Sequence, residues 1–134
     1  MASAILCVMD FSAASTTALQ WAVRYACGNK IHLTVLYPYR LTRLPFNESA
    51  LMLRKKIEDE AVRNFEVLEK DLLKGCNVSY DFKTEVGFLS DRVKEHVRKQ
   101  PINFVVIAKN LKSTNKESFD ELMETTDVPV VIVP

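Results

Sequence analysis

A carboxylate and a hydroxyl, Asp10 and Ser12, follow an apolar run over residues 5–9. The run does not alternate with polar residues, which indicates a strand buried on both faces of a parallel sheet. Ligands of open α/β sheets bind beyond the carboxyl ends of the strands, near the point where the strand order reverses. If this strand is central, Asp10 can accept a hydrogen bond from an exocyclic amine or a ribose hydroxyl of a ligand.

Both residues also have a purely structural interpretation. Asp10 would be stabilised by the macrodipole and the free amides of a following helix, and Ser12 is a favourable N-cap residue. Position alone favours this interpretation, most strongly for Ser12. Ligand binding by Asp10 and Ser12 is therefore one of two open alternatives.

A second group of polar residues, KNLKSTNK, occupies residues 109–116 after another continuous apolar run. Lys109, Asn110 and Lys112 could contact a phosphate or an acidic metabolite. A solvated loop is the structural alternative, and lysines favour it. The chain has only 3 glycines, none of which forms a P-loop or dinucleotide fingerprint. Glycine amides that could approach a polyphosphate are therefore missing from this loop.

Residue combinations typical of enzymes are also missing from the sequence. His32 falls within an expected strand and His96 on an expected helix, and neither has a cysteine or carboxylate at a characteristic spacing. We expect both histidines to be structural. There is no nucleophile elbow and no HExxH motif, and Asp10 is followed by Phe11 rather than by the second acid of a receiver domain. We therefore expect no enzymatic activity, no metal and no cofactor.

The elements that would position these residues alternate strictly. Strands are expected over residues 5–9, 31–37, 78–86, 102–108 and 128–133, and helices over residues 14–27, 48–74, 90–99 and 117–125. This alternation predicts one α/β domain over residues 1–134, a three-layer open sandwich with a five-stranded parallel sheet. Residues 78–86 alternate apolar with polar side chains, and Pro129 suits an edge, so the third and last strands are expected at the edges.

Several residues are expected to set the ends and faces of these elements. Gly28 should close the first helix, Pro38 should end the second strand, and Gly75 should end the long helix. The inward faces are expected to carry Ala18, Trp21, Ala22 and Tyr25 on the first helix; Leu53, Ile57, Ala61, Phe65, Leu68 and Leu72 on the second; Leu89, Val93 and Val97 on the third; and Phe119, Leu122, Met123 and Thr126 on the fourth.

Composition limits the partners and the compartment. The net charge of +1 gives no broad attraction to nucleic acid or anionic lipid, and no apolar run approaches the length of a membrane span. Cys7, Cys27 and Cys76 are odd in number and lack metal-ligand spacing. We therefore expect reduced thiols, a cytoplasmic location, and no nucleic-acid or membrane partner.

Three segments together resemble the universal stress protein family: ILCVMDFS at residues 5–12, IHLTVLYPY at 31–39 and VPVVIVP at 128–134. The resemblance covers the whole chain in order. It implies the strand order 3-2-1-4-5 of the adenine-nucleotide-hydrolase-like, or HUP-type, fold. It also implies a homodimer in which the last strands pair antiparallel, with Val128, Val130 and Ile132 at the interface. A second domain in tandem beyond Pro134 is the alternative cover for that strand.

One branch of this family binds ATP through the motif G-x2-G-x9-G-[ST] after the fourth strand. Here Lys109 and Lys112 occupy the first two glycine positions, and Lys116 and Glu117 the last two positions, with 3 residues between the parts instead of nine. Of the family's nucleotide contacts, only Asp10 is a clear match.

The resemblance therefore implies a non-enzymatic, dimeric stress-response protein that does not bind ATP through this loop. The alternative is a member in which Asp10 and the lysines hold ATP or AMP by another route, with weak or no hydrolysis.

Overall fold

Strands and helices alternate along the chain in the computed structural model, which describes residues 3–41, 49–111 and 116–134. In chain order the elements are β1 (Ala4–Val8), α1 (Ala13–Asn29), β2 (His32–Tyr39), α2 (Ala50–Leu68), the π-helix η1 (Glu69–Leu73), β3 (Tyr80–Val86), α3 (Leu89–Lys99), β4 (Ile102–Ala108), α5 (Lys116–Thr125) and β5 (Val130–Val133).

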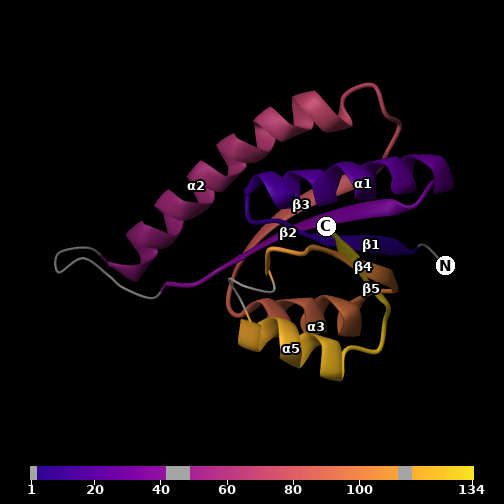
Figure 1. Cartoon of the computed structure of the whole chain (residues 1–134). Helices are drawn as coiled ribbons and strands as arrows, with labels where there is room; N and C mark the ends of the chain where they lie inside the picture. Colours follow the sequence, from indigo (N-terminus) through magenta and orange to yellow (C-terminus); the bar gives the residue numbers. More distant parts are fainter. Residues whose placement is uncertain (1–2, 42–48, 112–115) are drawn as a thin grey trace.

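The five strands form one parallel sheet of order β3-β2-β1-β4-β5, which confirms the predicted topology. Figure 1 shows α1 and α2 on one face of this sheet and α3 and α5 on the other. All five residues of β1 are buried because this strand is central and covered on both faces. The strand order reverses beside β1, so the end of β1 is where such sheets bind ligands.

Alternate residues of β1 enter two separate cores. Ile5 and Cys7 belong to the cluster under α1 and α2, whereas Leu6 and Val8 belong to the cluster under α3 and α5. Successive side chains of a strand point to opposite faces, so a continuous apolar run fills both layers. This packing fixes the orientation of β1 and therefore the position of Asp10 just beyond its end.

Pro38 does not end β2, contrary to the sequence expectation, because the strand continues to Tyr39. The Leu33 amide donates to Ser79 and the Tyr39 carbonyl accepts from Gly87, and both partners flank β3. The backbone N–H and C=O groups of odd-numbered residues in β2 therefore point toward β3, and those of even-numbered residues, Pro38 included, point toward β1. The pairing of β1 with β2 ends at Val8 and Leu36. The missing N–H of Pro38 therefore faces a side where β1 has already ended, and no ladder bond is lost.

Helix α1 differs from its prediction at its end and on its inner face. Gly28 lies within the helix, and Lys30 forms the left-handed C-cap with φ 53°. Ala18 and Ala22 are buried as expected, but Trp21 and Tyr25 are each 37% exposed. Their rings stack on each other and lie edge-on to Phe104 of β4, with centroids 6.1 and 5.1 Å away. The two aromatic side chains therefore pack against β4 and stay partly exposed instead of entering the core.

The long helix is interrupted where a regular one was expected. The predicted stripe holds at Ala61 and Phe65, which are buried, but the π-helix η1 then adds residues to the turn and buries Leu73 instead of Leu72. Gly75, with φ 85°, ends the segment as predicted. The N-terminal part of α2 reaches out beyond the sheet (Figure 1), and Leu51 there is 77% exposed.

The remaining inward faces follow the expectation with one clear exception. Phe119 and Leu122 of α5 are buried, but Met123 is 44% exposed. Leu89 and Val93 of α3 are buried as predicted.

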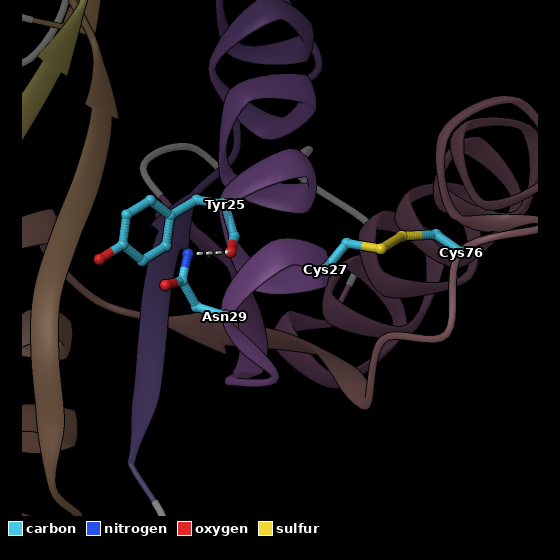
Figure 2. Close-up of a disulfide and its surroundings, with 4 residues drawn as sticks. All are labelled: Tyr25, Cys27, Asn29 and Cys76. Carbon is cyan, nitrogen blue, oxygen red and sulfur yellow. Dashed lines mark hydrogen bonds between the residues drawn. A yellow bond between two sulfur atoms is a disulfide. The ribbon is translucent and has the colours of Figure 1, made fainter.

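The expectation of three reduced cysteines is wrong, because Cys27 and Cys76 form a disulfide. The two residues are 49 positions apart, and their Cα atoms are 6.3 Å apart. Figure 2 shows the bond between the last turns of α1 and the segment that leads into β3. Only the fold brings these residues together, since neither lies in a recognisable pairing motif. Cys7 is the one free cysteine and is buried in β1.

Candidate functional site at the end of the central strand

The polar residues predicted at the ends of β1 and β4 meet in one hydrogen-bonded network. Oδ1 of Asp10 accepts from the Ser12 hydroxyl at 2.5 Å and from the Ser12 amide at 2.9 Å. The Ser12 Oγ accepts from Nδ2 of Asn110 at 3.0 Å, across 98 residues of chain. Parallel strands direct their carboxyl ends to the same edge, and this places Asn110 beside Ser12.

The same network begins helix α1, so the structural interpretation of Ser12 is correct. Its Oγ accepts from the amide of Ser15, which makes Ser12 the N-cap. Phe11, which lies between Asp10 and Ser12, has φ 62°, a region that bulky residues rarely adopt. Its ring packs edge-on against Tyr37 and Phe82 at 5.2 and 6.1 Å, and these contacts hold the turn in place. The Ser12 hydroxyl therefore already forms hydrogen bonds with Asp10, Ser15 and Asn110.

Asp10 remains chemically available. Burial alone would raise the pKa of this carboxyl, but hydrogen bonds from Ser12, Ser15 and backbone amides outweigh that effect and lower its pKa below the usual 3.8. The Ser12 amide and hydroxyl both donate to Oδ1 rather than to Oδ2. Asp10 is therefore an anion at neutral pH, suited to accept from amines and hydroxyls and unsuited to contact phosphate.

We expect Asp10→Asn to lower the free energy of unfolding at neutral pH by about 1 kcal/mol, a value reduced because the carboxylate is partly exposed. A lowered folded-state pKa stabilises the protein above the unfolded-state value near 3.8 and loses that effect as the pH falls through the folded-state value. The difference from the unmodified protein should therefore be full at pH 6 to 7 and vanish in strong acid, as measured by urea unfolding across pH.

The matched control is Asp127→Asn, which removes an equal charge from an exposed side chain. It should leave stability unchanged at every pH. A constant difference for Asp10→Asn down to strong acid would contradict the assignment.

A pocket of about 200 Å³ opens beside Asp10 on the α3 face of the sheet. Its volume is below the range of roughly 300–1,000 Å³ common for small-molecule sites. Apolar side chains dominate its lining, which consists of Val8, Met9, Asp10, Pro38, Tyr39, Arg40, Gly87, Leu89 and Leu111. The Arg40 guanidinium lies 4.1 Å from the centre of the Phe88 ring, and this contact fixes a positive charge at the rim. Sequence reasoning missed Arg40 as a site residue, and its position after β2 was the available signal.

A second pocket, of about 270 Å³, lies under α2 and also includes Asp10. Tyr37, Glu60 and Asn64 contribute its other polar groups. Burial, followed by the charges of Glu60 and Asp10, raises the pKa of Tyr37. The negative potential at this pocket opposes an anionic ligand.

The predicted anion loop contributes less than its lysines suggested. The side chain of Lys109 is exposed and its amide donates to the carbonyl of Val133, so this amide is not available to a phosphate. Leu111 is 2% exposed and belongs to the core under α3 and α5. Lys112 lies outside the described residues, so its role stays a prediction.

Each histidine contacts a carboxylate of β3, in agreement with a structural role. Nε2 of His32 lies 2.8 Å from Asp81, and Nε2 of His96 lies 3.0 Å from both oxygens of Glu85. Asp81 lies on β3, the strand that pairs with the β2 strand of His32, so the two residues are 49 positions apart. Glu85 lies near the end of β3, 11 positions before His96 on α3. Among residues 3–41, 49–111 and 116–134, no cluster of histidine, cysteine and acidic side chains could hold a metal.

The predicted interface residues lie on or just before an edge strand. β5 pairs with β4 on one side, and among the described residues no strand pairs with its other edge. Val128 and Val130 are partly buried against the core, whereas Ile132 is 42% exposed. An unpaired apolar edge is a ready template for another strand.

Comparison with known proteins agrees with this geometry. The sequence profile described as the universal stress protein family matches residues 1–134. A universal stress protein family member from Burkholderia pseudomallei has a similar structure, with TM-score 0.76, 16% identity, and coverage of 98% of this chain and 95% of that one. No curated protein sequence matches the chain.

Two further similar structures carry nucleotides by their descriptions. One is the universal stress protein from Archaeoglobus fulgidus in complex with dAMP, with TM-score 0.68, 10% identity, and coverage of 100% of this chain and 98% of that one. The other is a universal stress protein in complex with cAMP, with TM-score 0.66, 14% identity, and coverage of 98% and 97%. At these identities the likeness supports the fold alone.

Proposed function

Because the chain belongs to the universal stress protein family, we propose that it is a non-enzymatic stress-response protein that does not bind ATP through the family's glycine loop. The proposal rests chiefly on the segment after β4, where Lys109, Lys112 and Lys116 replace motif glycines. Side chains at such positions keep backbone amides away from phosphates.

Local packing supports the same conclusion. Leu111 places a buried apolar side chain at the pocket beside Asp10, and the Lys109 amide is bonded to β5. A triphosphate would find few main-chain donors here and would face the negative charge of Asp10.

We propose that the protein is a homodimer joined along β5. The support is the unpaired edge of that strand and the exposure of Ile132. A partner strand would satisfy the edge and cover this side chain. A second domain in tandem would cover the same edge in place of a second copy.

The second candidate function is binding of a nucleoside monophosphate by a route independent of the glycine loop. One observation favours it: the pocket of about 200 Å³ has an anionic acceptor, Asp10, at its floor and a cation, Arg40, at its rim. Asp10 could accept from a ribose or base, while Arg40 could pair with one phosphate. Relatives described with dAMP and cAMP make this the appropriate alternative.

Thermal unfolding with added ligand separates the two candidates. We expect millimolar ATP with Mg²⁺ to leave the melting temperature unchanged, because a ligand that does not bind the native state cannot stabilise it. A ligand present at 100 times its dissociation constant would add about 2.7 kcal/mol, roughly 8 °C for a domain of this size. A saturating rise with ATP would overturn the first proposal. A rise with AMP alone, abolished by Arg40→Gln, would favour the second.

We propose a cytoplasmic location, although the reasoning from reduced cysteines no longer holds in full. The structure has no helix, among the residues it describes, that is long and apolar enough to cross a membrane. Disulfides in reducing compartments are usually transient, catalytic or redox-sensing. A cytoplasmic location therefore requires the Cys27–Cys76 bond to be of that kind.

A further inference from the structure

The two sulfurs of the disulfide have different surroundings. Cys27 is exposed on the last turns of α1, whereas Cys76 is partly buried and packs against the core under α1 and α2. Figure 2 shows the bond on the side of α1 away from the Tyr25 ring, facing the segment that carries Cys76. A thiol from solvent can therefore reach the Cys27 sulfur more easily than the Cys76 sulfur.

The end of α1 is secured without the disulfide. Nδ2 of Asn29 donates to the Tyr25 carbonyl at 2.9 Å, as drawn in Figure 2, and the Lys30 amide bonds to the Ala26 carbonyl. These bonds satisfy carbonyls that a helix otherwise leaves unpaired. Opening the disulfide should therefore leave α1 intact.

The segment on the other side of the bond is held more weakly. Residues 74–79 form no helix or strand. The Lys74 amide bonds to Glu69 at one end and Ser79 bonds to β2 at the other, but between them Cys76 bonds only to Leu73 and Val78. η1 before this segment is held more firmly, because Leu73 is buried in the core and the Tyr80 hydroxyl donates to Glu69. β3, by contrast, is fixed to β2 by seven register pairs from Tyr80 to Val86. Loss of the cross-link should therefore loosen residues 74–78 and leave η1 and β3 in place.

From this asymmetry we propose that Cys27 and Cys76 form a thiol–disulfide exchange site, which a dithiol reductant opens by attack at Cys27, releasing residues 74–78 from α1 while the sheet stays folded. The partner class is a dithiol, either a small molecule or the exposed dithiol of a redox protein.

The exchange balances in two steps. A reductant thiolate attacks the Cys27 sulfur, so that a mixed disulfide forms, the Cys27–Cys76 bond breaks, and the Cys76 sulfur leaves as a thiolate that takes up a proton. The second reductant thiolate then attacks the reductant sulfur of the mixed disulfide and releases Cys27. The reductant loses two electrons and becomes a disulfide, and the protein gains two thiols. A disulfide of the same class reverses the reaction.

Cys7 is not part of this site. It is fully buried in the central strand, and burial raises the pKa of its thiol to about 12. A thiol with so little thiolate and no access to solvent does not exchange under native conditions.

The test uses the full chain under native conditions with dithiothreitol, followed by iodoacetamide and mass spectrometry. Before reduction we expect no labelled cysteine, and after reduction we expect Cys27 and Cys76 to be labelled and Cys7 to remain unlabelled. At labelling times too short for global unfolding, hydrogen exchange should become at least tenfold faster over residues 74–78 on reduction, while α1 and the five strands stay protected. The variant Cys27→Ser with Cys76→Ser is the control, and dithiothreitol should not alter its exchange pattern.

Single variants test the direction of attack. The free thiol of Cys76→Ser, which is Cys27, should react with iodoacetamide at least tenfold faster than the free Cys76 of Cys27→Ser. Equal rates would overturn the assignment of Cys27 as the attacked residue. Labelling of Cys27 and Cys76 before reduction, resistance of the bond to dithiothreitol until the protein is denatured, or loss of the sheet on reduction would each overturn the proposal.

Discussion

Replacing Ile132 by glutamate should convert the proposed dimer into a monomer. Ile132 is 42% exposed on β5, the edge strand through which we propose self-association. A two-fold interface contains the substitution twice, so it loses two apolar contacts and must accommodate two carboxylates. We expect the dissociation constant to rise at least about 100-fold, equivalent to roughly 2.7 kcal/mol. Sedimentation equilibrium over a range of concentrations measures this change directly.

The matched control is Val62→Glu, which places the same charge on an exposed apolar residue of α2. Val62 is 45% exposed, close to the value for Ile132, but it lies on a helix instead of the edge strand. This control should leave the dimer intact. A dimer that persists in Ile132→Glu, or an unmodified protein that is monomeric at all concentrations, would contradict the proposal for β5.

The second large effect concerns the disulfide as a cross-link. Replacing both Cys27 and Cys76 by serine should lower the free energy of unfolding of the oxidised protein by about 4 kcal/mol, the value that chain entropy predicts for the loop of 49 residues. For a domain of this size the melting temperature should fall by roughly 10–15 °C. The effect arises mainly in the unfolded state, whose freedom the cross-link restricts. Urea unfolding without reductant measures it.

Unfolding of the unmodified protein in the presence of dithiothreitol separates the cross-link from the side chains. The reduced protein should match the double serine variant within about 1 kcal/mol, because exposed Cys27 and partly buried Cys76 contribute little packing of their own. If the reduced protein kept the stability of the oxidised one, the cross-link would not be the source of the effect. This result would leave the β5 proposal untouched.

The sequence by itself was sufficient for the architecture. The unbroken apolar runs of β1 and β4 predicted buried strands, and the alternation of apolar with polar residues in β3 predicted an edge strand, as the sheet order has them. The loss of motif glycines after β4 is likewise visible without coordinates, because a side chain excludes backbone approach wherever the loop lies.

Only the tertiary structure decided the contacts between residues far apart in the chain. Asn110 reaches Ser12 across 98 residues, and Cys76 reaches Cys27 across 49, since each pair is joined by the packing of separate elements. Pro38 continues β2 because β1 happens to end beside it. Local periodicity records which face of an element is buried, but it does not record which other element covers that face. The hydrogen bonds around Asp10, the position of Arg40 and the disulfide therefore required the fold.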